Sequence, residues 1–171
     1  PFNLGCPMCS GNVTVRSNSL GSTHPELLKE WHPTLNGDLS PFGVSPGSNK
    51  KVWWMCEVAD DHIYDMDITS KATKNQGCPM CSGKRIVKSN CLASTHPEIS
   101  KEWHPKLNGD LTPYDVVSGS HRKVWWICDV EKDHIWTATI KNRSKLNQGC
   151  GVCSGKVVVP SNSLKKNYPN I

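Results

Sequence analysis

The sequence predicts a tandem array of small α+β units, each with a short helix, an irregular loop, a β-hairpin and a closing Cys-x-x-Cys pair. Such pairs open at Cys6, Cys78 and Cys150, with a period of 72 residues. Residues 10–81 match residues 82–153 at 40 of 72 positions without a gap, which indicates an internal duplication. Only 36% of the residues are hydrophobic, so a unit of this length buries a thin core and needs a staple.

The same period sets the expected domain boundaries. We expect the end of a preceding unit in residues 1–16, a first complete unit in 17–83 and a second in 84–155. Residues 156–171 repeat the opening of both units and are expected to start a further unit, truncated or divergent.

Each unit is expected to begin with a short helix at a His-Pro pair. In the second unit Thr95 is placed to cap this helix, Pro97 suits its first turn and Glu98 completes a capping box. The helix is expected to run to about Trp103 and to end at His104, because a residue before proline is pushed away from helical angles. The repeated histidines beside prolines are therefore assigned to capping or packing.

An irregular loop and a hairpin are expected to follow the helix. The Asn-Gly-Asp sequence at residues 108–110 is a turn signal. Residues 123–128 and 134–140 have the pattern of two strands, and the five residues between Cys128 and His134 form the turn that joins them. The hairpin would thus bring a thiolate and an imidazole together at one end. The segment between the hairpin and the closing Cys-x-x-Cys pair, here called the knuckle, is expected to be a loop.

The cysteine pattern favours a metal site over disulfides. The chain has nine cysteines, an odd number, and eight of them belong to Cys-x-x-Cys or Cys-x5-His elements. Two intervening residues let both sulfurs of a knuckle face one ion, and two further soft ligands complete a tetrahedron. A closed set of three Cys and one His suits structural zinc. The ninth cysteine, Cys91, is expected to be a small, partly buried side chain.

Two assignments of the zinc ligands are open. The first forms one site from Cys56, His62, Cys78 and Cys81, and a second from Cys128, His134, Cys150 and Cys153. The other joins Cys6 and Cys9 to Cys56 and His62, and joins Cys78 and Cys81 to Cys128 and His134. The first closes a gap of 16 residues rather than 47, which loop-closure entropy and local strand pairing favour. It predicts two complete zinc sites and leaves Cys6 and Cys9 as a third half-site.

The repeated elements Glu-Trp-His-Pro, Lys-Val-Trp-Trp-x-Cys and Gly-Cys-x-x-Cys-Ser-Gly resemble a family described as a probable zinc-ribbon or treble-clef zinc finger, whose members often occur in tandem. The resemblance covers both units and the two fragments. It implies that a unit ends at its Cys-x-x-Cys, in agreement with the first ligand assignment. Two features depart from the family: five residues instead of three separate the hairpin Cys from the His, and Gly151 replaces a proline of the knuckle.

The main functional hypothesis is a non-catalytic module that binds nucleic acid, RNA in preference to DNA, within a larger protein or ribonucleoprotein assembly such as an organellar ribosome. Four-ligand sites offer neither a vacant metal position nor a nucleophile with its base, and the net charge of +5 permits polyanion binding. A solvent-facing tryptophan from Trp53/Trp54 or Trp125/Trp126 could stack on a base, because adjacent residues of a strand face opposite sides. The cations expected to contact phosphate are Lys71, Lys74, Arg122, Lys123, Lys141, Arg143 and Lys145.

Two other roles are consistent with the same sequence. One is a scaffold with structural zinc that holds neighbouring proteins in a larger assembly, such as an organellar ribosome. The other is a DNA-recognition module attached to a nuclease, as the resemblance implies. No apolar run is long enough for a membrane helix, and thiolate ligands imply a reducing intracellular compartment, an organelle such as the mitochondrion included.

Overall fold

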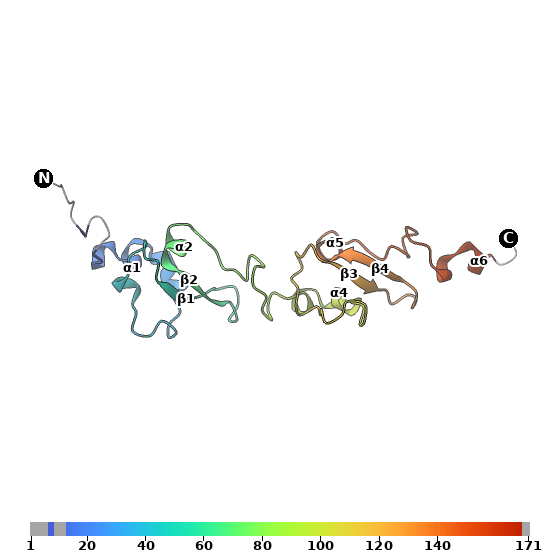
Figure 1. Cartoon of the computed structure of the whole chain (residues 1–171), viewed down its shortest axis with the longest axis horizontal. Helices are drawn as coiled ribbons and strands as arrows, with labels where there is room; N and C mark the ends of the chain where they lie inside the picture. The colour runs from blue at the N-terminus through green and yellow to red at the C-terminus, as the bar shows by residue number, and fades with distance from the viewer. Residues whose placement is uncertain (1–6, 9–12, 169–171) are drawn as a thin grey trace. The chain divides into compact units, whose positions relative to one another are not determined.

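The computed structural model describes residues 7–8 and 13–168 and divides into two compact units, Pro1–Arg85 and Ile86–Ile171 (Figure 1). Cys6 and Cys9, the expected third half-site, lie outside the described residues. The first unit contains η1 (Arg16–Asn18), α1 (Leu20–Thr23), η2 (Pro25–Lys29), η3 (Pro41–Gly43), β1 (Lys51–Met55), β2 (Ile63–Asp67) and α2 (Ile68–Ala72). The second contains α3 (Leu92–Thr95), α4 (Pro97–Lys101), β3 (Lys123–Ile127), β4 (Ile135–Thr139), α5 (Ile140–Lys145), η4 (Pro160–Asn162) and α6 (Leu164–Asn167).

Each unit is built around the expected two-stranded antiparallel hairpin. β1 pairs with β2 and β3 pairs with β4, in the same register in both units. A short bridge adds a third extended segment, because Trp31 pairs with Trp54 and Trp103 pairs with Trp126. The two indoles of each bridge also meet edge to face, with ring centroids 5.5 Å apart in the first unit and 5.4 Å in the second. This aromatic pair anchors the helical segment to the hairpin.

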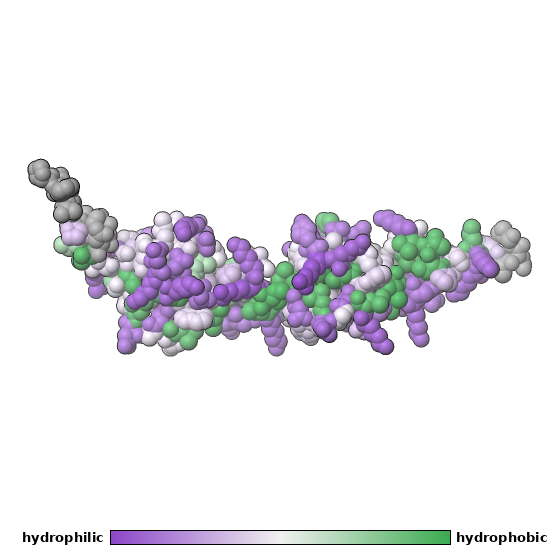
Figure 2. Space-filling view, viewed as in Figure 1, coloured by the Kyte–Doolittle hydropathy of each residue, from purple (hydrophilic) through white to green (hydrophobic). Residues whose placement is uncertain are grey.

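Strand alternation decides which tryptophan of each adjacent pair enters the core. Trp54 and Trp126 are fully buried, whereas Trp53 and Trp125 are 39% and 40% exposed. The core of the second unit contains Trp126 together with apolar residues from the helices, the loop, the hairpin and the knuckle: Leu92, Trp103, Val116, Val124, Trp136, Ile140 and Val152. As expected for so thin a core, much of the remaining surface is hydrophilic (Figure 2).

The single helix that the sequence predicts around Thr95 is two helices. α3 ends at Thr95, whose hydroxyl donates to the Cys91 carbonyl at 2.8 Å instead of capping α4. His96 separates the two helices, with φ −142° and ψ 65°, because the proline that follows excludes it from helical angles. Pro97 then occupies the first turn of α4, as expected. Cys91, expected to be partly buried, is almost fully buried directly before α3.

The segment expected to be a loop between hairpin and knuckle begins with a helix in both units. α2 and α5 start directly at the ends of β2 and β4. Asp67 caps α2 by accepting a hydrogen bond from the Ser70 amide at 2.8 Å, and Thr139 caps α5 by accepting one from the Asn142 amide at 3.2 Å. None of the helices in the described part of the chain has the length and apolar character of a membrane span.

Candidate functional site: two metal centres and a hairpin face

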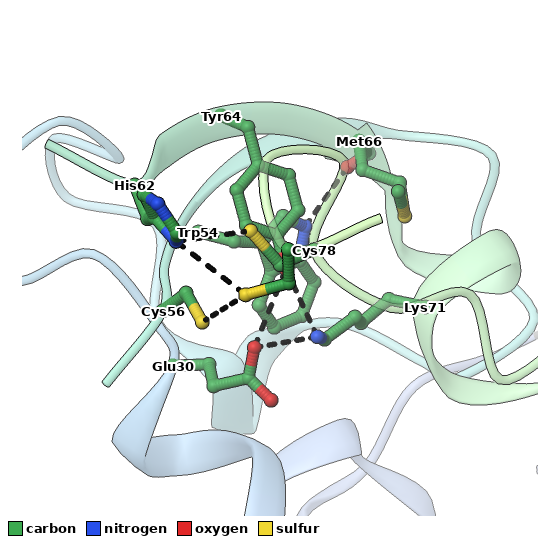
Figure 3. Close-up of polar contacts among 9 residues, drawn as sticks. Glu30, Trp54, Cys56, His62, Tyr64, Met66, Lys71 and Cys78 are labelled. Atoms are coloured by element: carbon green, nitrogen blue, oxygen red, sulfur yellow. Dashed lines mark hydrogen bonds and ion pairs between the residues drawn. The ribbon is translucent and has the colours of Figure 1, made fainter. Parts of the chain in front are cut away.

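The hairpin and the knuckle of the first unit bring four ligand atoms together. Cys56 Sγ lies 3.7 Å from Cys81 Sγ, and His62 Nδ1 lies 3.7 Å from Cys78 Sγ and 3.5 Å from Cys81 Sγ. All four atoms lie within 4.8 Å of one another. Figure 3 shows the labelled side chains of Cys56, His62 and Cys78 directed toward one another.

The second unit repeats this arrangement. Cys128 Sγ lies 3.8 Å from Cys153 Sγ, and His134 Nδ1 lies 3.9 Å from Cys150 Sγ and 3.3 Å from Cys153 Sγ. Again, all four ligand atoms lie within 4.8 Å of one another. Both groups follow the first of the two assignments, in which a hairpin combines with the knuckle that follows it.

These separations fit a zinc ion in each group. Zn–S bonds of about 2.3 Å and Zn–N bonds of about 2.0 Å, at tetrahedral angles, separate two sulfurs by about 3.8 Å and a sulfur from a nitrogen by about 3.5 Å. A disulfide would need two sulfurs at about 2.0 Å, and the cysteines of both groups are free. With four protein ligands a site is closed to substrate, so zinc here would supply a structural cross-link and no chemistry.

Local backbone geometry explains why these ligands converge. The Cys56 amide donates to the His62 carbonyl at 3.0 Å, and the Cys128 amide donates to the His134 carbonyl at 3.1 Å, which closes the turn of each hairpin. Each knuckle turns back on itself at a glycine, Gly83 with φ 71° and the equivalent glycine of the second unit with φ 73°. Glycine adopts this left-handed conformation without the steric cost that a Cβ atom imposes.

The second unit also supplies a hydrogen bond that orients its imidazole. His134 Nε2 lies 3.0 Å from Ser161 Oγ, so with Nδ1 facing the thiols the Nε2–H can donate to the serine. Asp133 in turn accepts from the Ser161 amide at 2.9 Å. Partners of this kind fix the tautomer and the ring orientation of histidine ligands. The segment after the knuckle therefore contributes to the metal centre that precedes it.

The thiols of each group are crowded. Desolvation, followed by the neighbouring sulfurs, raises the pKa of Cys81 to about 12 and that of Cys153 to about 12. Three such sulfurs do not ionise together without a cation. Zinc binds the thiolate form and displaces the protons, so its affinity for these sites falls with decreasing pH.

A buried ion pair lies beside the first metal centre. Lys71 Nζ is 2.5 Å from Glu30 Oε2 and 3.0 Å from Tyr64 Oη, and the lysine is 6% exposed (Figure 3). Burial, followed by the charge of Glu30, raises the pKa of Tyr64 well above its ordinary value. This placement removes Lys71 from the surface at which it was expected to contact phosphate.

Arg143 has the same position in the second unit. Its guanidinium contacts both carboxylate oxygens of Glu102, with Nε 3.1 Å from Oε2 and Nη2 against Oε1. Because its side chain is 13% exposed and held by this fork, Arg143 is also removed from the expected phosphate-binding surface. Trp136 stands where the first unit has Tyr64, and its indole N–H has no hydrogen-bond partner among the described residues.

The other expected phosphate contacts lie closer to solvent. Lys141, on α5, is half-buried. The exposed ones are Lys74, Arg122, Lys123 and Lys145. The structure thus separates the predicted cations into two structural residues and five that a polyanion can approach.

An asparagine that sequence reasoning assigned only to a turn holds the exposed tryptophan in place. Asn108 accepts from the Trp125 amide at 2.8 Å and donates to the Trp125 carbonyl at 2.9 Å. Asn36 makes the same pair of bonds with Trp53, at 2.8 and 3.0 Å. The side chain acts as a further strand partner for one residue, which fixes the backbone that carries the indole. The repetition of Asn-Gly-Asp in both units was the available signal.

A family model described as a probable treble clef zinc finger domain matches the chain twice, over residues 27–84 and 99–156. Each match ends just after a knuckle, so each contains a complete group of four ligands. A comparison with curated proteins finds no match.

Proposed function

The chain belongs to the family of probable treble clef zinc finger domains, and on that premise we propose that its two units use structural zinc to present an RNA-binding surface. Such a family points to a non-catalytic module. The ligands of the first ion are Cys56, His62, Cys78 and Cys81; those of the second are Cys128, His134, Cys150 and Cys153. Since thiolate ligands persist only where thiols stay reduced, the module acts in a reducing intracellular compartment.

The observation that carries the proposal is the outward-facing tryptophan of the hairpin. Trp125 is 40% exposed although its neighbour Trp126 is fully buried, and Asn108 fixes its backbone. An indole held in solvent among exposed cations suits a base stacked on the ring and phosphates beside it. Single-stranded RNA offers unstacked bases of this kind, whereas duplex DNA does not.

The cations that remain at the surface supply the electrostatic contribution. Arg122 and Lys123 precede and begin β3, and Lys141 and Lys145 lie on α5. Each cation that neutralises a phosphate of a single strand contributes about −0.7 to the slope of log affinity against log salt concentration. If all four contact phosphate, their replacement reduces the magnitude of the slope by about 3.

Fluorescence anisotropy with the zinc-loaded chain and an oligouridine of about 12 nucleotides tests the proposal. We expect affinity to fall steeply between about 50 and about 200 mM salt. We also expect it to fall when Arg122, Lys123, Lys141 and Lys145 are replaced by glutamine. Lys101→Gln is the matched control, because Lys101 is exposed on α4 and paired with Glu98 at 2.8 Å. An affinity that changes neither with salt concentration nor with the fourfold replacement would contradict RNA binding.

An oligodeoxyuridine of the same length as the oligouridine tests whether the chain prefers RNA to DNA. Tighter binding of the RNA is expected if a 2′-hydroxyl is contacted. Tighter binding of the DNA contradicts the choice of RNA and favours the module as the DNA-recognition part of a larger nuclease.

One observation favours a second role as a scaffold between proteins. Val58 and Val130 occupy the hairpin turn at equivalent positions and are 72% and 64% exposed. A repeated exposed valine at a fixed position suits a small apolar contact with a neighbouring protein in an assembly such as a ribosome. Val58→Ser and Val130→Ser together would then abolish association with that assembly, while leaving oligouridine affinity unchanged.

A further inference from the structure

On the outward face of the first hairpin, a carboxylate pairs with two nearby cations. The register places Trp53 opposite Asp65 and Lys51 opposite Asp67. The Asp65 carboxylate accepts from Arg85 at 3.0 Å and lies 3.7 Å from Lys51. The hydrogen bond from Arg85 is the main cause that holds the pKa of Asp65 below its ordinary value, so this carboxylate is ionised at neutral pH. A phosphate approaching Trp53 therefore meets the negative charge of Asp65, and two nearby cations, Lys51 and Arg85, are already paired with it. Lys84, the counterpart of Lys156, is exposed and takes part in no ion pair among the described residues.

The same face of the second hairpin contains no carboxylate. The register places Trp125 opposite Thr137 and Lys123 opposite Thr139, so a neutral hydroxyl replaces each aspartate of the first unit. Among the described residues neither Lys123 nor Lys156 takes part in an ion pair, and both are exposed. This face therefore combines an exposed indole with two cations that no carboxylate neutralises.

A groove opens on this face of the second unit. Its volume is about 880 Å³, and both cations, Trp125 and the two threonines line it. The lining also includes three side-chain amides, Asn142, Asn147 and Gln148, and apolar residues such as Ile135, Trp136 and Val157. Amides offer both a donor and an acceptor, which suits the hydrogen-bonding edge of a base. A groove lined by tryptophan, amides and cations has the composition of a nucleotide site.

We propose that this groove is the nucleotide-binding site of the chain: a base of single-stranded nucleic acid stacks on Trp125 while Lys123 and Lys156 contact its phosphates. The equivalent face of the first unit does not bind, because the Asp65 carboxylate lies opposite Trp53 and pairs with Lys51 and Arg85. The assignment rests on the proposed function and adds an asymmetry that the proposed function does not require.

Two matched truncations test the asymmetry with the zinc-loaded whole chain and labelled oligouridine. Trp125→Ala should weaken binding roughly tenfold or more, because it removes a stacked base. Trp53→Ala, at the equivalent position of the first unit, should change affinity less than about twofold, within the scatter of a surface substitution. Trp125→Phe keeps an aromatic face and should restore most of the affinity. Zinc content and circular dichroism of each variant confirm that it is folded.

An exchange of one residue between the units tests the electrostatic cause. Thr137→Asp introduces into the second hairpin the residue that the first accommodates at the same register position. It should weaken binding and reduce the magnitude of the salt slope by about 0.7, because Lys123 gains an intramolecular partner. The reciprocal Asp65→Thr should leave the affinity unchanged or strengthen it.

The outcomes separate this inference from the function on which it rests. No binding of oligouridine by the wild-type chain contradicts both. Salt-dependent binding that Trp53→Ala and Trp125→Ala weaken equally supports the proposed function but overturns the assignment to one unit. Binding that Thr137→Asp leaves unchanged, in affinity and in salt slope, overturns the electrostatic cause. Loss of a protein partner with unchanged RNA affinity in Trp125→Ala identifies the groove as a protein-docking site and overturns the proposal.

Discussion

Lys71 Nζ lies 2.5 Å from Glu30 Oε2, in an ion pair that joins α2 to the segment after η2 across 41 residues of sequence. The lysine also contacts Tyr64 Oη and is 6% exposed. A buried cation persists only where a carboxylate and further acceptors replace the water it has lost. Lys71 is therefore a structural residue of the first unit.

Replacement of Lys71 by glutamine should destabilise the first unit by roughly 3 kcal/mol, because Glu30 keeps its charge without a partner. The control is Lys74→Gln, three residues later and exposed, which should cost less than about 0.5 kcal/mol. Hydrogen exchange of β1 and β2 measures the effect, and exchange of β3 and β4 should not change. Equal effects of the two substitutions would show that the ion pair contributes nothing.

The two hydrogen bonds between the Asn108 side chain and the Trp125 backbone, here called the asparagine clamp, lead to a second prediction. Asn108→Ala removes two hydrogen bonds, each with a net value of about 1 kcal/mol. The Trp125 amide should then exchange with solvent at least tenfold faster by NMR, a loss of about 1.4 kcal/mol of local protection. Asn36→Ala is the control, since it removes the same bonds from Trp53 only. Unchanged protection of the Trp125 amide in Asn108→Ala would show that the clamp does not fix the indole's backbone.

Two substitutions of Thr139, the cap of α5, should affect stability and RNA binding differently. Thr139→Ala should cost about 1 kcal/mol, because the Asn142 amide loses its acceptor. Thr139→Asp should retain that stability, because Asp67 caps α2 in the same way, yet it should weaken oligouridine binding by adding charge to the groove. Denaturant unfolding and anisotropy on the same samples measure both. A variant with aspartate that is as unstable as the one with alanine contradicts the assigned cap.

Acid should release zinc before it protonates the structural carboxylates. Hydrogen bonds, from Arg85 to Asp65 and from the Ser70 amide to Asp67, are the largest causes that hold both pKa values below the ordinary value. Their stabilisation is therefore present above that ordinary value and is lost only as the pH falls through the lower folded value. Thiolates take up protons at higher pH and release the metal. Zinc release, followed with a chelating dye, should keep its midpoint in Asp65→Thr and Asp67→Thr, and a shift would show that the carboxylates control it.

The hairpins and the ligand groups were predictable because their signals are local and repeated. Strand alternation also gives the exposed and buried tryptophans. The helices α2 and α5 were missed because each begins at the last residue of a strand pattern: Asp67 and Thr139 end a strand and cap a helix, with no turn residue between. The burial of Lys71 and Arg143 could not be seen, since each is paired with a glutamate 41 residues away. Local sequence gives no indication of such a partner.

The groove was missed for a related reason. Thr137 carries no chemical signal of its own, and its importance appears only when the register places it opposite Trp125, where the first unit has Asp65 opposite Trp53. If the same amino-acid difference lay on the inward face of the strand, it would not change the charge that a ligand meets at the surface. The strand register and the direction of each side chain, which only the folded hairpin shows, place the Asp-to-Thr difference between the units at the surface beside the exposed tryptophan.

Zinc stoichiometry with X-ray absorption at the zinc edge tests the central claim most directly. The folded chain should hold two zinc ions, each with about three sulfur ligands at about 2.3 Å and one nitrogen at about 2.0 Å. Cys78→Ser should retain one ion and a folded second unit, and Cys150→Ser should retain one ion and a folded first unit. Fewer than two ions in the wild-type chain, or loss of both ions in Cys78→Ser, would contradict two independent zinc-stapled units.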